Sequence, residues 1–161
     1  VVLAGVLFVT RGLRRRSAPR MIPVTWEQIP EYLERLLRRG YDAGFVAFTI
    51  PGEERFVSVT KYLRETGEGG LEFDFPRSAW SSRYYDPLRR LLEERGRKVE
   101  IVKTPEGPVE EYLRVDCGGD AADAAALVRL VLEDVFAYPP GSPLVAEQQQ
   151  VAARAEMIDT E

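Results

Sequence analysis

Residues 115–120, VDCGGD, combine the chain's single cysteine with two glycines and two aspartates. A cysteine at a strand-to-helix turn becomes a nucleophile when a cation or a helix N-terminus lowers the pKa of its thiol, and a glycine-rich turn can hold a phosphate. Asp116 and Asp120 oppose both functions, because their negative charges raise a thiol pKa and repel an anion. We therefore expect Cys117 to be a buried strand residue and Asp120 to cap the following helix.

Four carboxylates form a second group of candidate residues. Glu72 and Asp74 alternate along one predicted strand, while Asp116 and Asp120 lie at the end of another. Such carboxylates can act as an acid and a base or bind Mg²⁺ or Ca²⁺. Alternating acids are also typical of the solvated face of a sheet, with Arg114 as a cross-strand partner. We favour the solvated face and expect no metal site. A hydrolase or divalent-metal-dependent enzyme that uses Asp74, Asp116 and Asp120 is the alternative.

An aromatic group precedes and enters the second predicted helix. Trp80, Arg83, Tyr84 and Tyr85 lie within six residues of one another, and aromatic and arginine side chains are enriched in the hot spots of protein interfaces. The same side chains can close the edge of a hydrophobic core while their polar atoms reach water. Both interpretations stay open, and these four residues are the predicted binding site.

The composition excludes several kinds of chemistry. The 161 residues contain no histidine and one cysteine, which rules out a histidine-based catalytic pair, a thiolate metal cage and an intramolecular disulfide. Five arginines and no acid lie in residues 1–20, so the rest of the chain has 17 basic and 26 acidic residues. An acidic domain is poorly suited to bind a phosphate backbone, so we expect no nucleic-acid partner. No motif points to a cofactor or a small-molecule ligand.

The N-terminal 20 residues have two interpretations. Residues 1–9 are uninterrupted apolar or small residues, and Arg11 and residues 14–16 follow them as the basic flank of a membrane span would. A nine-residue run is shorter than the roughly 20 residues needed to cross a bilayer. The segment is therefore either a truncated membrane anchor, with residues 1–16 in contact with the membrane, or sequence upstream of a start at Met21. In both cases we expect a cytoplasmic domain, free or anchored.

Hydrophobic periodicity and turn residues predict six segments. These are a helix over residues 24–40, a hairpin over 43–64, a strand over 69–76, a helix over 78–96, a hairpin over 98–117 and a helix over 120–136. We thus predict an α+β two-layer sandwich in the order αβββαββα, with helices on one face of a mainly antiparallel five-stranded sheet. Residues 21–138 form this single domain, and residues 139–161 are expected to be a Pro/Gly linker and a mobile polar tail.

The order of these elements resembles that of type III secretion chaperones and YbjN-like proteins. The segments that carry the resemblance are VTWEQIPEYLERLL, AGFVAFTIPGEERFVSVTKYLR, LEFDFP, YYDPLRRLLEERG, KVEIVK, EEYLRVDC and DAADAAALVRLVLEDVF. The resemblance covers residues 25–136. Proteins of that group are mostly homodimers that bind other proteins and are not enzymes. The resemblance therefore implies an interaction role.

Together these observations predict a small non-catalytic protein-interaction module, tethered to the cytoplasmic face of a membrane if the N-terminal span is real. Its partner would be another protein or a second copy of the chain. Two other classes stay open, namely the carboxylate-dependent enzyme and a structural component of the cell envelope.

Overall fold

The computed structural model describes residues 20–105 and 107–149, which form one seven-stranded antiparallel sheet and three helices. The strand order across the sheet is β1-β7-β2-β3-β4-β6-β5, and all neighbouring strands run antiparallel. The elements along the chain are β1 (Arg20–Val24), η1 (Trp26–Gln28), α2 (Ile29–Arg39), β2 (Phe45–Thr49), β3 (Phe56–Leu63), β4 (Gly69–Arg77), α3 (Ser82–Glu94), β5 (Glu100–Lys103), β6 (Glu111–Gly118), α4 (Ala121–Leu130), the π-helical turn η2 (Val131–Val135) and β7 (Leu144–Gln149).

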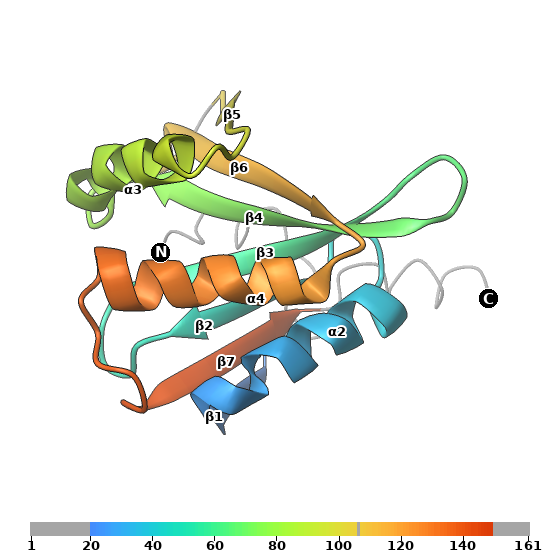
Figure 1. The fold of residues 1–161 in the computed structure, drawn as a ribbon, viewed down its shortest axis with the longest axis horizontal. Helices are drawn as coiled ribbons and strands as arrows, with labels where there is room; N and C mark the ends of the chain where they lie inside the picture. The colour runs from blue at the N-terminus through green and yellow to red at the C-terminus, as the bar shows by residue number, and fades with distance from the viewer. Residues whose placement is uncertain (1–19, 106, 150–161) are drawn as a thin grey trace.

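The three helices lie against one face of the sheet, and the main hydrophobic core fills the space between the two layers (Figure 1). Side chains alternate between the faces of a strand, so every second residue points at the helices. On β4 these residues are Leu71, Phe73 and Phe75, which are fully buried. On β6 they include Leu113 and Val115, which contact the same core. The predicted α+β class with an antiparallel sheet is confirmed.

The prediction of five strands is wrong, because β1 and β7 also belong to the sheet. β7 lies between β1 and β2, although its polar sequence, LVAEQQ, predicts part of a mobile tail. Leu144 and Ala146 alternate with more polar residues and are buried in the main core. β1 contains Pro23, which an edge strand tolerates because one side of it needs no ladder hydrogen bonds. The domain therefore extends at least to Gln149.

Local capping residues set where two helical segments begin. Thr25 and Gln28 form the predicted capping box at η1, and the Thr25 backbone N–H donates to Gln28 Oε1 over 2.8 Å. Asp120 accepts a hydrogen bond of 3.0 Å from the backbone N–H of Asp123 and caps α4, as expected. This cap fixes the turn that connects β6 to α4.

Among the described helices, none is long and apolar enough to cross a membrane. The predicted membrane contact of residues 1–16 lies outside the described residues, and so do residues 150–161 of the predicted tail.

Candidate functional site

The two faces of the sheet differ, and the candidate site lies on the face that points away from the helices. We call this the second face. One cross-strand row defines it, running from β1 to β5 through Met21, Glu147, Ala47, Ser58, Asp74, Arg114 and Glu100.

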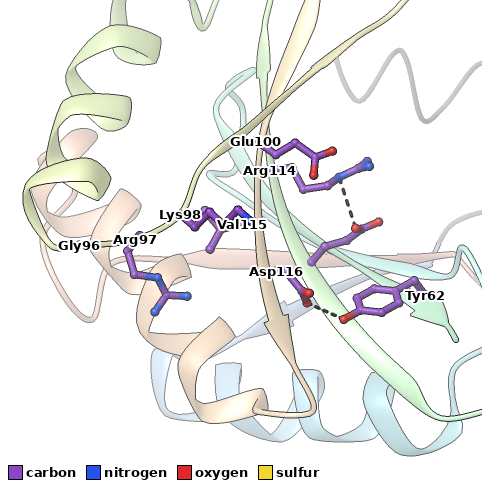
Figure 2. A pocket seen from close by; sticks show the side chains of 9 residues that line it. Tyr62, Gly96, Arg97, Lys98, Glu100, Arg114, Val115 and Asp116 are labelled. Carbon is purple, nitrogen blue, oxygen red and sulfur yellow. Dashed lines mark hydrogen bonds and ion pairs between the residues drawn. The ribbon is translucent and has the colours of Figure 1, made fainter.

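A cleft of about 700 Å³ lies at the end of this face, beside β6. β5 pairs only with residues 111–114 of β6, so the second half of β6 has no outer strand within the described sheet. The connection between α3 and β5 passes there instead, and Figure 2 shows it on one side of β6 with Tyr62 on the other. The lining residues are Tyr62, Glu72, Gly96, Arg97, Lys98, Glu100, Arg114, Val115 and Asp116.

Tyr62 on β3 reaches across β4 to Asp116 on β6. Its hydroxyl donates to Asp116 Oδ1 over 2.5 Å, and the backbone N–H of Gly118 donates to the same oxygen over 2.8 Å. The tyrosine ring lies over its register partner Gly70, where an added Cβ would come within 2.3 Å of the ring. A glycine at position 70 is therefore what allows Tyr62 to lie across β4.

Arg114 is shared between two carboxylates of β4. Its Nε donates to Asp74 Oδ1 over 2.8 Å and lies 3.4 Å from Glu72 Oε2. The pairing of β4 with β6 creates this contact, because Asp74 faces Arg114 and Glu72 faces Asp116. The predicted cross-strand partner is confirmed. The predicted solvated face is wrong here, because only 5% of Asp74 is exposed.

The single positive charge of Arg114 does not balance the negative charges of Glu72 and Asp74. Burial and repulsion by Asp74 raise the pKa of Glu72 to about 7, against the attraction of Arg114. Burial also raises the pKa of Asp74, although Arg114 opposes the shift. Burial acts in the same direction on Asp116, but the hydrogen bonds that this carboxylate accepts outweigh it and leave its pKa below the usual value. The cleft therefore holds one carboxyl that titrates near neutral pH and one that is ionised there.

The connection between α3 and β5 forms the other wall of the cleft. Arg97 donates two hydrogen bonds of 2.7 Å to the carboxylate of Asp123 in the first turn of α4. This bidentate pair neutralises the arginine and anchors the connection to the helix layer. Lys98 and Glu100 are exposed at the rim.

Cys117 lies on the helix face of the sheet at the end of β6, where 7% of it is exposed. Burial raises the pKa of its thiol to about 12, with a further contribution from Asp123. The thiol is therefore protonated at neutral pH, and the prediction of a buried strand cysteine is confirmed.

The three aspartates of the enzyme hypothesis do not come together. Asp74 is buried against Arg114, Asp116 is held by Tyr62, and Asp120 caps α4. In the part of the chain that the structure describes, no group of three or more His, Cys, Asp or Glu side chains could hold a metal ion. Of the three, Asp116 alone lines the cleft.

The four predicted binding residues also separate. Trp80 and Tyr84 pack on Phe136, with ring centroids 6.1 and 5.0 Å apart, and so close the edge of the core. Tyr85 is fully buried and its hydroxyl donates to a glutamate of β6. Arg83 is exposed and lies over the ring of Tyr84. Arg83 and Tyr84 line a second cleft of about 380 Å³ between α3 and η2, so this pair keeps a place on a concave surface.

Four polar residues of the cleft beside β6 are missing from the prediction, namely Tyr62, Arg97, Lys98 and Glu100. The adjacent glycines 69 and 70 in a predicted strand are the signal that points to Tyr62, because glycine within a strand indicates the close approach of another group. Arg97, Lys98 and Glu100 have no comparable signal in the sequence.

Comparisons of the chain with protein-family models, with curated proteins and with solved structures find no match. The resemblance to type III secretion chaperones and YbjN-like proteins stays a prediction. The function is therefore proposed from the chemistry of the cleft.

Proposed function

We propose that the chain is a small non-catalytic protein-interaction module that binds a basic side chain of its partner in the cleft beside β6. The observation that supports it is the charge imbalance around Arg114. Glu72 and Asp74 both contact this guanidinium, and Glu100 is its register partner on β5. Asp116 adds a further carboxylate to the lining of the same cleft.

The other cations of the cleft do not remove this imbalance. The charge of Arg97 is neutralised by Asp123, which leaves Lys98 at the rim as the second cation. Arg64 donates a hydrogen bond to the Tyr62 hydroxyl and acts electrostatically on Asp116. The four carboxyl groups Glu72, Asp74, Glu100 and Asp116 therefore face three cations, and Glu72 is the group whose pKa is raised to about 7.

A cation from outside would relieve the repulsion within the cleft. An ammonium or guanidinium beside Glu72 favours its ionised form and would lower its pKa. Charge-assisted hydrogen bonds to a partly buried carboxylate are stronger than bonds between neutral groups. Lysine and arginine carry their charges on long side chains, so a partner can place one in the cleft while its backbone stays at the rim.

The test is a calorimetric titration of the full chain with an acetylated, amidated tetra-arginine peptide. The same peptide with citrulline in place of arginine is the matched ligand, because citrulline keeps the shape and loses the charge. We expect binding of the arginine peptide and at least tenfold weaker binding in the double variant Glu72→Gln, Glu100→Gln. The double variant Glu54→Gln, Glu65→Gln is the charge-matched protein control, since both residues lie in exposed turns and neither is part of the cleft lining.

Two results would contradict the proposal. The first is equal affinity for the arginine and citrulline peptides. The second is an equal loss of affinity in the cleft variant and in the Glu54→Gln, Glu65→Gln control, which would indicate attraction to the overall negative charge rather than to the cleft.

A hydrolase is the second candidate, and one observation favours it. The pKa values of Glu72 and Asp116 are displaced in opposite directions, as those of an acid and a base in one site are. Glu72 would then give a proton to a leaving group and Asp116 would accept one from water. Turnover of chromogenic esters or glycosides by the chain, lost in Glu72→Gln and kept in Glu65→Gln, would favour this candidate over binding.

A further inference from the structure

The cleft of about 380 Å³ between α3 and η2, which we call the α3–η2 cleft, lies in the helix layer of the domain (Figure 1). It shares no lining residue with the cleft beside β6. Part of its lining is apolar, with Pro87 and Leu91 on α3 and Val135 on η2. It is therefore a separate concave site, to which the proposed function gives no role.

Two arginines of the α3–η2 cleft have no acidic partner among the described residues. Arg83 donates a hydrogen bond of 2.6 Å to the hydroxyl of Tyr84 and lies 4.8 Å from the centre of that ring, but it forms no ion pair. Arg90 is exposed, and its side chain forms neither an ion pair nor a hydrogen bond within the same residues. Arg89, the neighbour of Arg90 on α3, differs because it lies 3.5 Å from Glu93.

The nearby carboxylates do not neutralise these two arginines. Asp86 is not part of the cleft lining and forms no ion pair in the described part of the chain. Glu94 lines the cleft one helical turn beyond Arg90 and is likewise without an ion pair there. Asp134 on η2 lies 3.8 Å from Arg95, a residue outside the lining. The cleft is therefore positive along the first two turns of α3.

The position of Arg83 on its helix adds to this positive charge. α3 begins at Ser82, and its first turn contains no acidic residue. The N-terminus of a helix carries a partial positive charge that favours a nearby anion. An anion in this part of the cleft would thus interact favourably with both the guanidinium of Arg83 and the helix terminus.

We propose that the α3–η2 cleft binds an acidic segment of a partner protein, with carboxylates on Arg83 and Arg90. The two arginines are seven residues apart, so their backbone positions differ by about 10.5 Å along the helix axis. A run of acidic residues contains carboxylates at this spacing. Each guanidinium can donate two parallel hydrogen bonds to a carboxylate, and the aliphatic parts of the acidic side chains pack on Pro87 and Leu91.

The overall charge of the chain opposes such a partner. The net charge is −4 at pH 7, so an acidic peptide is repelled at long range. Binding of such a peptide must therefore come from a local group of cations. This inference does not rest on the proposed function, because the cleft and the charge of the ligand are both different.

The test is a calorimetric titration of the full chain with an acetylated, amidated octa-glutamate peptide. The octa-glutamine peptide is the matched ligand, because it keeps the length and loses the charge. We expect binding of the glutamate peptide alone, and at least tenfold weaker binding in the double variant Arg83→Gln, Arg90→Gln. The control is Arg38→Gln, Arg89→Gln, which removes the same charge from two exposed ion pairs outside the cleft lining.

Glu94→Gln is a second variant, and its effect cannot arise from loss of folding. It removes a carboxylate from the cleft lining, so the glutamate peptide should bind at least twofold more tightly, while Glu65→Gln in an exposed turn should change little. A loss confined to the Arg83, Arg90 variant together with a gain in Glu94→Gln supports the proposal. Absence of binding, equal binding of the glutamine peptide, equal losses in the two arginine variants, or no gain in Glu94→Gln overturns it.

Discussion

The helix face and the second face of the sheet both bury the middle of their strands, but with different kinds of residue. On the helix face the neighbouring positions of β2, β3 and β4 are Val46, Val59 and Phe73. On the second face the equivalent row is Ala47, Ser58 and Asp74. The same strands are thus buried by apolar packing on one side and partly by hydrogen bonds and ion pairs on the other.

This difference in residue type means that the two faces contribute to stability in different ways. Apolar burial on the helix face gains stability in proportion to area and depends little on pH. On the second face, Asp74 is separated from water, Glu72 is partly buried, and both depend on Arg114. A buried ion pair contributes little net stability, but the loss of one partner is costly. The second face should therefore be the pH-sensitive half of the domain.

The largest expected effect comes from breaking the pair on the second face. Arg114→Met leaves Asp74 buried without its cation and should lower the free energy of unfolding by about 3–5 kcal/mol at pH 8. The loss should shrink towards pH 4, where protonation removes the uncompensated charge. Denaturant unfolding at both pH values measures it. Arg38→Met, which removes an exposed i,i+4 pair with Glu34, is the control and should cost no more than about 0.5 kcal/mol. Equal losses in the two variants would mean that the Asp74 pair is not buried.

A matched pair of substitutions compares the two faces directly. Ala146 and Ala47 lie on adjacent strands, both are fully buried, and they point to opposite faces. Ala146→Ser places a hydroxyl in the apolar core and should cost about 1–3 kcal/mol. Ala47→Ser should cost less than about 1 kcal/mol, because Ser58 and Glu147 are its register partners. Thermal unfolding of both variants checks the order, and a larger loss for Ala47→Ser would remove the distinction between the faces.

A smaller effect of opposite sign is expected at Glu72. Its folded pKa of about 7 lies above the value of an unfolded chain, so the folded state binds the proton more tightly and loses stability as pH rises from about 4.5 through 7. Glu72→Gln removes this penalty and should stabilise the domain by about 1–2 kcal/mol at pH 8 and by almost nothing at pH 4.5. Melting curves over this pH range, with Glu65→Gln as the control, give the measurement. A variant that is less stable than the wild type at pH 8 would show that the Arg114 contact outweighs the burial of Glu72.

The elements of the helix face could be predicted from the sequence because their signals are local. The alternation of Leu71, Phe73 and Phe75 defines β4, and the turn at residues 51–54 defines the β2–β3 hairpin. β7 has no comparable signal, since its pairing with β1 and β2 joins segments about a hundred residues apart and half of its side chains are polar. Sequence periodicity alone does not indicate such a strand.

The cleft could be predicted only in part. The sequence shows that Glu72 and Asp74 alternate and that Arg114 is available as a partner. The structure confirms that Arg114 contacts both carboxylates. The burial of Asp74 is not visible, because it depends on the tertiary packing around β4. The place of Tyr62 depends on the register that puts its ring over Gly70. The register depends on how the strands pair in the folded chain. These contacts could therefore not be predicted from the sequence alone.

The pH dependence of peptide binding tests the central claim, a cation site at Glu72, most directly. Glu72 has a pKa of about 7, so at pH 6 it is mostly protonated and at pH 8 mostly ionised. Calorimetric titration of the wild-type chain with the tetra-arginine peptide should therefore show about tenfold tighter binding at pH 8 than at pH 6, with net proton release near pH 7. The Glu72→Gln variant should show neither the change in affinity nor the proton release. Binding that is equally tight at both pH values, or a pH dependence that survives in Glu72→Gln, would contradict the account.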